Sequence, residues 1–221
     1  EMLGRIFESL LEDNKEKGAF YTPKEIVQYM CRRSLTAYLQ ADVPDERMRK
    51  KIDEFVRTKD YDCLRLYLPL SRREQVAERL RTVKICDPAI GSGAFPMGLL
   101  RELYLCRIAL EDEVKEDPFK SHAEIKKEIL QQNIYGVDLD RGAVDIARLR
   151  FWLSLVVDED VPQPLPNLDY KIMQGNSLLE RYKDVDLSTL ASQKTDGRLI
   201  FIDDENDASR LSLHHLLVAY Y

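Results

Sequence analysis

The sequence lacks the features that mark several classes of protein. No apolar run approaches the ~18–20 residues of a membrane-spanning helix, so we expect neither an integral membrane protein nor a membrane partner. The four cysteines lie far apart, no Cys-x-x-Cys pair occurs and there are only 3 histidines, which disfavours both a disulfide scaffold and a metal site. No signal peptide is evident, and the reducing cytoplasm is therefore the expected compartment.

Apolar and charged residues are both plentiful. Of the 221 residues, 44% are hydrophobic and 33% are charged, which is enough for a core and excludes wholesale disorder. The net charge is −6, but it is uneven: residues 1–82 carry a net charge of +2 and residues 83–221 carry −8. The acidic balance of the second segment argues against a broad basic channel for DNA within it.

The hydrophobic pattern changes near Val83, and this change divides the chain into two predicted parts. Residues 1–82 show helical stripes of apolar residues, which predict an N-terminal helical segment. In residues 83–221, short β-like runs alternate with helical patterns, which is typical of an α/β domain with a parallel sheet. The predicted fold class is therefore α/β, with a helical segment in front.

Start signals locate the individual elements. The helices of the first part are expected around residues 3–11, after a capping box at 22–25, around 48–56, and after a cap at 71–74. In the second part, strands are expected at 83–87, 134–138 and 170–173, with a fourth at 198–202. Ser121 and Asp140 are expected to cap two of the helices between strands, and a terminal helix is expected from about Asp207.

Polar residues follow the three clearest strands. Asp87, Asp138 and Asn176 stand at or just beyond the strand ends, and the carboxyl ends of parallel strands meet at one edge of a sheet. The turn Gly91-Ser92-Gly93 allows a ligand to approach the backbone closely, and the next helix presents its N–H groups to a carboxylate. An acid after the second strand is suited to ribose hydroxyls, and a side-chain amide to an adenine edge.

A nicotinamide dinucleotide site is the first rival interpretation, and the spacing argues against it. The dinucleotide motif Gly-x-Gly-x-x-Gly has a third glycine where this chain has Pro96. Its acidic residue follows about 20 residues later, whereas Asp138 lies 45 residues after Gly93. A Walker A phosphate-binding loop is absent from the sequence.

Four segments together resemble a known family. Residues 87–95, Asp-Pro-Ala-Ile-Gly-Ser-Gly-Ala-Phe, are similar to the S-adenosylmethionine-binding motif of adenine-N6-specific DNA methyltransferases. Residues 18–23, 133–140 and 175–179 resemble the motif that precedes it and the two that follow, in the expected order. The resemblance covers roughly residues 1–180 and favours the type IIG fused enzymes and type I modification subunits of restriction–modification systems.

The resemblance implies a Rossmann-like, class I methyltransferase domain that binds S-adenosyl-L-methionine. By this resemblance, Asp87 and the turn hold the amino-acid part of the cofactor, Asp138 the ribose, and Leu139 and Asn176 the adenine. Residues 21–23 would line the methionine end. The full set of expected cofactor-binding residues is Tyr21, Thr22, Pro23, Asp87, Pro88, Ala89, Gly91, Gly93, Phe95, Asp138, Leu139, Asn176 and Ser177.

The family's catalytic Asn-Pro-Pro-Tyr motif has no counterpart here, because no Pro-Pro pair occurs. We therefore expect no catalytic residue in this chain, and we expect it to be a partial methyltransferase domain that acts on DNA through a longer parent. In the family the first strand is central, so its open edge would be covered by residues 198–202, by the terminal helix or by self-association.

Two alternatives remain open from the residues. The chain could serve as a non-catalytic interaction module that contacts DNA or a partner through its helical segment. The parent could also be an RNA or protein methyltransferase, since the segment that decides the substrate is missing. The basic clusters at 32–33, 49–51 and 72–73 are expected to form solvated faces, and Phe151 and Trp152 to belong to the core.

Overall fold

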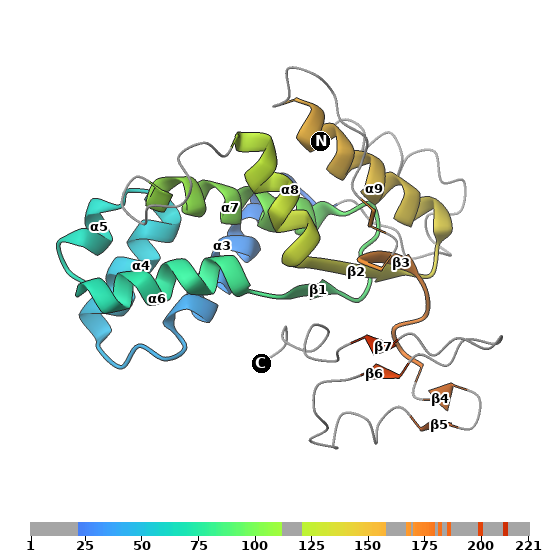
Figure 1. Ribbon diagram of the computed structural model, residues 1–221, viewed down its shortest axis with the longest axis horizontal. Coiled ribbons are helices and arrows are strands. Elements are labelled where there is room, and N and C mark those ends of the chain that lie inside the picture. Colours follow the sequence, from blue (N-terminus) through green and yellow to red (C-terminus); the bar gives the residue numbers. More distant parts are fainter. Residues whose placement is uncertain are drawn as a thin grey trace.

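The computed structural model describes residues 22–111, 121–157, 167–168 and 170–179, and the backbone of four two-residue strands further on. Within these ranges a group of helices precedes a three-stranded parallel sheet with helices on one side (Figure 1). This arrangement confirms the α/β class. None of the described helices is long and apolar enough to cross a membrane.

The first group contains α3 (Lys24–Gln40), α4 (Glu46–Thr58), α5 (Asp62–Arg65) and α6 (Leu70–Thr82). Its interior is apolar: the fully or almost fully buried side chains include Leu35, Leu39, Ile52, Phe55, Val56, Leu64 and Leu80. The short helix α5 was not anticipated from the sequence. The first predicted helix, around residues 3–11, lies outside the described residues.

The predicted capping box at 22–25 and the predicted cap at 71–74 are both wrong. Helix α3 follows Pro23, whose carbonyl accepts from the Val27 amide at 3.1 Å, and no side chain caps it. Helix α6 follows Pro69 in the same way, so Ser71 lies inside the helix. In both cases proline, with φ of −54° and −63°, is the last residue before the helix and places the start where no hydroxyl side chain can cap it.

The sheet contains β1 (Ile85–Asp87), β2 (Ile134–Asp138) and β3 (Ile172–Gln174), parallel and in the order β1-β2-β3. Helices α7 (Ala94–Glu111), α8 (His122–Gln132) and α9 (Arg141–Val156) lie on one side of it (Figure 1). The predicted caps are confirmed, since Ser121 and Glu124 form a capping box on α8 and Asp140 accepts from two amides of α9.

Close packing joins the helical group to the α/β unit. A Cβ added at Gly98 on α7 would lie 2.8 Å from both Cys31 Sγ and Val27 Cγ1, so the glycine lets α3 approach α7 closely. Buried Glu102 on α7 pairs with Arg32 on α3 at 3.1 Å and with Lys59, at the end of α4, at 2.5 Å. One apolar cluster runs through both parts and includes Phe55, Leu80, Leu103, Ile134 and Phe151.

The later strands differ from the prediction. β4 (Arg181–Tyr182) pairs with β5 (Val185–Asp186), and β6 (Leu199–Ile200) pairs antiparallel with β7 (Arg210–Leu211). The predicted fourth strand at 198–202 therefore does not pair with β1, and β7 is extended where a terminal helix was predicted. Pairing between segments about ten residues apart closes a short loop at low entropic cost, which a sequence pattern does not reveal.

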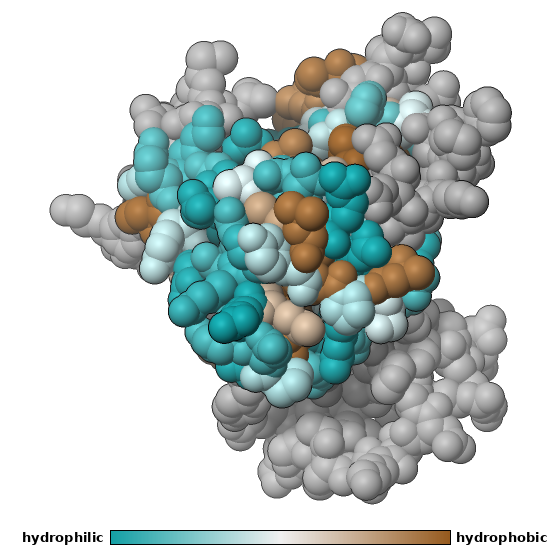
Figure 2. All heavy atoms as spheres, turned by 90° about the vertical axis from the view of Figure 1, so that its left-hand side faces the viewer, coloured by the Kyte–Doolittle hydropathy of each residue, from teal (hydrophilic) through white to brown (hydrophobic). Residues whose placement is uncertain are grey.

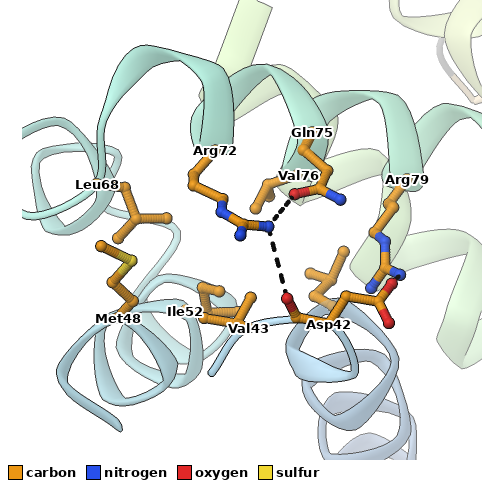
Figure 3. Close-up of a pocket in the computed structure, with 10 residues that line it drawn as sticks. Asp42, Val43, Met48, Ile52, Leu68, Arg72, Gln75, Val76 and Arg79 are labelled. Carbon is orange, nitrogen blue, oxygen red and sulfur yellow. Dashed lines mark hydrogen bonds and ion pairs between the residues drawn. The ribbon is translucent and has the colours of Figure 1, made fainter. Parts of the chain in front are cut away.

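The surface of the helical group has a small apolar cavity and, between α3 and α4, an open groove lined by charged residues. Figure 2 shows a mainly hydrophilic face on this side of the molecule, with separate apolar side chains. Figure 3 shows a small cavity among α3, α4 and α6, with apolar walls that include Val43, Ile52 and Val76. Arg72 at its rim donates to the Asp42 carbonyl at 3.5 Å and to Gln75 at 2.6 Å. This cavity contains no residue from the strand ends, and we regard it as a packing feature of the helical group.

Candidate functional site

The loops after the three parallel strands converge at one edge of the sheet. Strand register places Asp87 opposite Gly136 and Asp138 opposite Gln174. Backbone hydrogen bonds then link the loops, from Ile90 N to Val137 O at 3.0 Å and from Gly175 N to Asp138 O at 2.8 Å. The sequence analysis predicted that the residues after the three strands lie at one edge of the sheet, and this prediction is confirmed.

The carboxylate of Asp138 accepts hydrogen bonds from two loops, the one after β1 and the one after β2. Its Oδ2 accepts from the Gly91 amide at 2.7 Å, and its Oδ1 accepts from the Asp140 amide at 2.9 Å. Asp138 is only partly buried, and a carboxylate oxygen that accepts one hydrogen bond has a lone pair left for a further donor. The residue expected to contact ribose therefore also holds the turn that follows β1.

Asp87 lies in an environment that disfavours its charge. Burial raises the pKa of its carboxyl, the Asp138 carboxylate raises that pKa further, and the hydrogen bond from the Ala89 amide at 3.1 Å lowers it. Two neighbouring carboxylates favour a ligand that is cationic or donates hydrogen bonds. Among the residues that the structure describes, no group of three or more side chains is arranged to hold a metal ion.

The glycine turn, residues 91–93, has a backbone that side chains tolerate poorly. Gly91 has φ +52° and Gly93 has φ +81°. A Cβ at Gly93 would lie 3.2 Å from Ala147 Cβ on α9, whereas one at Gly91 would meet no atom within 4 Å. One side of the turn is therefore packed against α9, and the other side is open to a ligand at the start of α7.

The loop after β3 is tied to the loop after β1. Ser177 Oγ donates to the Pro88 carbonyl at 2.8 Å, and Asn176 Oδ1 accepts from the Leu178 amide at 3.0 Å. Ser177, expected to touch the cofactor, thus links two loops in this structure. Asn176 is exposed and forms a side-chain turn of its own.

Apolar surface lies beside these polar groups. Leu139 and Leu178, in the loops that follow β2 and β3, are 68% and 86% exposed. Gln174 Nε2 donates to the Leu139 carbonyl at 3.0 Å and steadies this loop. Exposed leucines next to hydrogen-bonding groups form the kind of wall on which a planar ring packs.

The N-terminal part of the predicted site is described only in part. Thr22 and Pro23 stand just before α3, which packs against the first turns of α7. The Phe95 carbonyl accepts a hydrogen bond from Cys31 Sγ at 3.5 Å, which joins the same two helices. Tyr21 lies outside the described residues.

Sequence reasoning missed Arg150 on α9. Its Nη1 donates to the Ser92 carbonyl at 2.7 Å and to Ser92 Oγ at 3.1 Å. Ala147 packs against Gly93 of the same turn, and residues three apart lie on one face of a helix. This spacing is the only signal that could have indicated that Arg150 reaches the turn.

The sequence around this site matches a known protein family. The family of the MmeI DNA-methyltransferase domain matches residues 69–196, more than half of the chain. The chain belongs to this DNA-methyltransferase family. The matched range includes β1, the glycine turn, β2 and β3 of the methyltransferase domain. The resemblance to methyltransferases of restriction–modification systems, drawn above from the motifs, is confirmed.

Curated relatives of this chain are much longer proteins. The chain is 31% identical to a predicted type II restriction enzyme and methyltransferase of Methanocaldococcus jannaschii, over 86% of the chain and 18% of that relative. It is 31% identical to the type II restriction enzyme and methyltransferase RM.Eco57I of Escherichia coli, over 44% of the chain and 11% of the relative. It is 25% identical to the adenine-specific methyltransferase BrxX of Escherichia coli O9:H4, over 66% of the chain and 11% of the relative. The chain thus spans less than a fifth of each of these relatives.

Proposed function

We propose that this chain is the S-adenosyl-L-methionine-binding part of an adenine-N6 DNA methyltransferase of a restriction–modification system. The observation that carries the proposal is the hydrogen bond between Asp138 and Gly91, which brings two of the methyltransferase-like motifs into one site. A Rossmann-like domain over residues 83–221, preceded by a helical segment over 1–82, belongs to the same proposal, as does a cytoplasmic location.

The residues at the site fit such a cofactor. The ligand would present an ammonium and a sulfonium, and the paired carboxylates of Asp87 and Asp138 favour cations and donors. Its own carboxylate would meet the N–H groups at the start of α7, beside the open side of Gly91. Leu139 supplies an exposed apolar surface for the adenine ring, and Asn176 an amide for its edge.

When bound, the cofactor supplies an electrophilic methyl group, and these residues would bind and orient it. The adenine specificity rests on the Asp-Pro-Ala-Ile-Gly-Ser-Gly form of residues 87–93 and on the likeness to the adenine-specific BrxX. DNA is the proposed partner of the longer protein. Because the chain contains no Asn-Pro-Pro-Tyr segment, we expect it to bind the cofactor without transferring the methyl group by itself.

Isothermal titration of the chain with S-adenosyl-L-methionine tests the proposal. We expect saturable binding to the wild type and binding at least about tenfold weaker to Asp138→Ala, which loses charged hydrogen-bond acceptors. Asp145→Ala, on the exposed face of α9, is the matched control and should bind within about twofold of wild type. Absence of binding to the wild type, or equal binding by Asp138→Ala and Asp145→Ala, would contradict the proposed site. Methylation of adenine in DNA by the chain alone would contradict the expectation that it is only part of a methyltransferase domain.

A groove on the helical group favours the interaction-module alternative. Four cationic side chains line it between α3 and α4, together with three acidic ones: the cations are Arg33, Arg49, Lys50 and Arg57. Salt-dependent binding of duplex DNA, without any binding of the cofactor, would support this alternative over the proposed function.

A further inference from the structure

Helix α9 contacts the glycine turn through two residues, Ala147 and Arg150, that are three positions apart on the helix. Ala147 packs against Gly93, where an added Cβ would be only 3.2 Å from Ala147 Cβ. Arg150 reaches the residue between the two glycines and donates from Nη1 to both oxygens of Ser92, at 2.7 and 3.1 Å. Ser92 is 7% exposed, so this contact lies on the packed side of the turn.

This contact acts on a backbone whose two glycines adopt conformations that residues with side chains rarely adopt. Both glycines have positive φ, and the Ser92 carbonyl between them is held in direction by a charged donor. The Gly91 amide of the same turn is held by Asp138. The turn is therefore fixed by two contacts, and the orientation of its N–H groups depends on both.

We infer that Arg150 is a positioning residue for the part of the site that receives the amino-acid end of the cofactor. Arg150 acts through Ser92 and need not touch the ligand. The inference rests on the proposed function, because it names the turn as the place where that end binds. It predicts a loss that is selective for ligands carrying an amino-acid moiety, whereas general destabilisation would affect all ligands alike.

Arg148 provides a matched control on the same helix. It donates to the Ile172 carbonyl from Nε at 3.1 Å and from Nη2 at 2.6 Å, and so makes an equivalent arginine-to-backbone contact with β3. Arg150→Met and Arg148→Met therefore remove similar interactions from neighbouring positions. Arg150→Lys and Ser92→Ala are milder changes, in case Arg150→Met does not fold. Ser92→Ala removes only the hydroxyl acceptor and leaves the carbonyl one.

The test compares two ligands by isothermal titration, with folding of each variant checked by circular dichroism. S-adenosyl-L-methionine carries the amino-acid moiety, and 5′-methylthioadenosine lacks it. Arg150→Met should bind the first about tenfold or more weakly and the second within about twofold of wild type, since the turn loses its hydrogen bonds from a charged group. Arg150→Lys and Ser92→Ala should show smaller losses of the same selective kind, and Arg148→Met should not be selective.

Hydrogen exchange of the ligand-free protein gives a second readout. The amides of residues 91–95 should exchange faster in Arg150→Met than in wild type or Arg148→Met. Unchanged exchange of the turn, or equal loss of both ligands, would overturn the inference. If the wild type fails to bind S-adenosyl-L-methionine, the proposed function and the cofactor part of the inference both fall, whereas the exchange result still decides whether Arg150 holds the turn.

Discussion

Gly91 and Asp138 are joined by a hydrogen bond of 2.7 Å from the glycine amide to carboxylate Oδ2, although 47 positions separate them in the chain. The other oxygen of the same carboxylate accepts from the Asp140 amide. Asp138 therefore shapes the glycine turn, and the proposed site gives it a second role, in binding the ribose of the cofactor. A substitution at Asp138 should accordingly affect folding as well as binding.

Asp138→Ala should lower the free energy of unfolding by about 2 kcal/mol, because two partly buried amides lose their acceptor. Asp138→Asn keeps one acceptor oxygen and should lose about half as much. Urea denaturation measures both. The control Asp145→Ala breaks only an exposed contact with Arg141 at 4.0 Å and should cost less than about 0.5 kcal/mol. Similar losses in Asp138→Ala and Asp145→Ala would contradict the first role.

The two glycines of the turn should respond differently to alanine. Gly93→Ala should cost about 2–3 kcal/mol, since it combines a positive φ with a contact of 3.2 Å to Ala147 on a packed helix. Gly91→Ala, with no atom within 4 Å, should cost only the backbone strain of about 1 kcal/mol. Thermal melts of the two variants give the ranking, and a greater loss in Gly91→Ala would be inconsistent with the packing of α9 against the turn.

Glu102→Ala should be among the most destabilising single substitutions in the described part of the chain. Glu102 is 1% exposed and pairs with Arg32 and Lys59, so removal would leave two partly buried cations without their carboxylate. We expect a loss of about 3 kcal/mol in urea denaturation. Glu78→Ala, which breaks an exposed pair with Arg81, should cost less than about 0.5 kcal/mol and controls for general loss of charge.

Asp87→Asn should make the protein more stable at neutral pH while weakening cofactor binding. The raised pKa of Asp87 means that the folded state favours the protonated acid more than the unfolded state does. The stability contributed by the protonated form is therefore present at acid pH and is lost as the pH rises through the raised pKa. Asn does not titrate and can still accept from the Ala89 amide.

Melting temperatures of the wild type and Asp87→Asn across the acid-to-neutral range test this expectation. The variant should melt at a higher temperature at pH 7, and the difference should diminish toward acid pH. A constant difference, or a lower melting temperature at pH 7, would show that burial and Asp138 do not act on Asp87 as described. Higher stability with weaker binding is the usual sign of a functional acid.

Local signals in the sequence predicted several elements correctly. Strand β2 has the predicted bounds, and Ser121 and Asp140 cap the helices they were expected to cap, because a cap and its amides lie within three residues. The starts of α3 and α6, each preceded by a proline, are predicted wrongly. Thr22 and Ser71 are residue types that often cap helices, and the sequence pattern does not show that the helices begin after Pro23 and Pro69 instead. The pairing of β6 with β7 is not predicted, because a local sequence pattern does not show which strands pair.

The sequence by itself determined the family and the polar residues at the strand ends, because these depend on short apolar runs and on glycines that one turn requires. Only the tertiary structure decided what those residues contact. Asp138 bonds Gly91, Arg150 bonds Ser92 and Ser177 bonds Pro88 across 47, 58 and 89 positions. A hydrogen bond requires its two atoms within about 3 Å. Over such separations, that distance is set by the order of the strands and the packing of α9, and not by neighbouring residues in the chain.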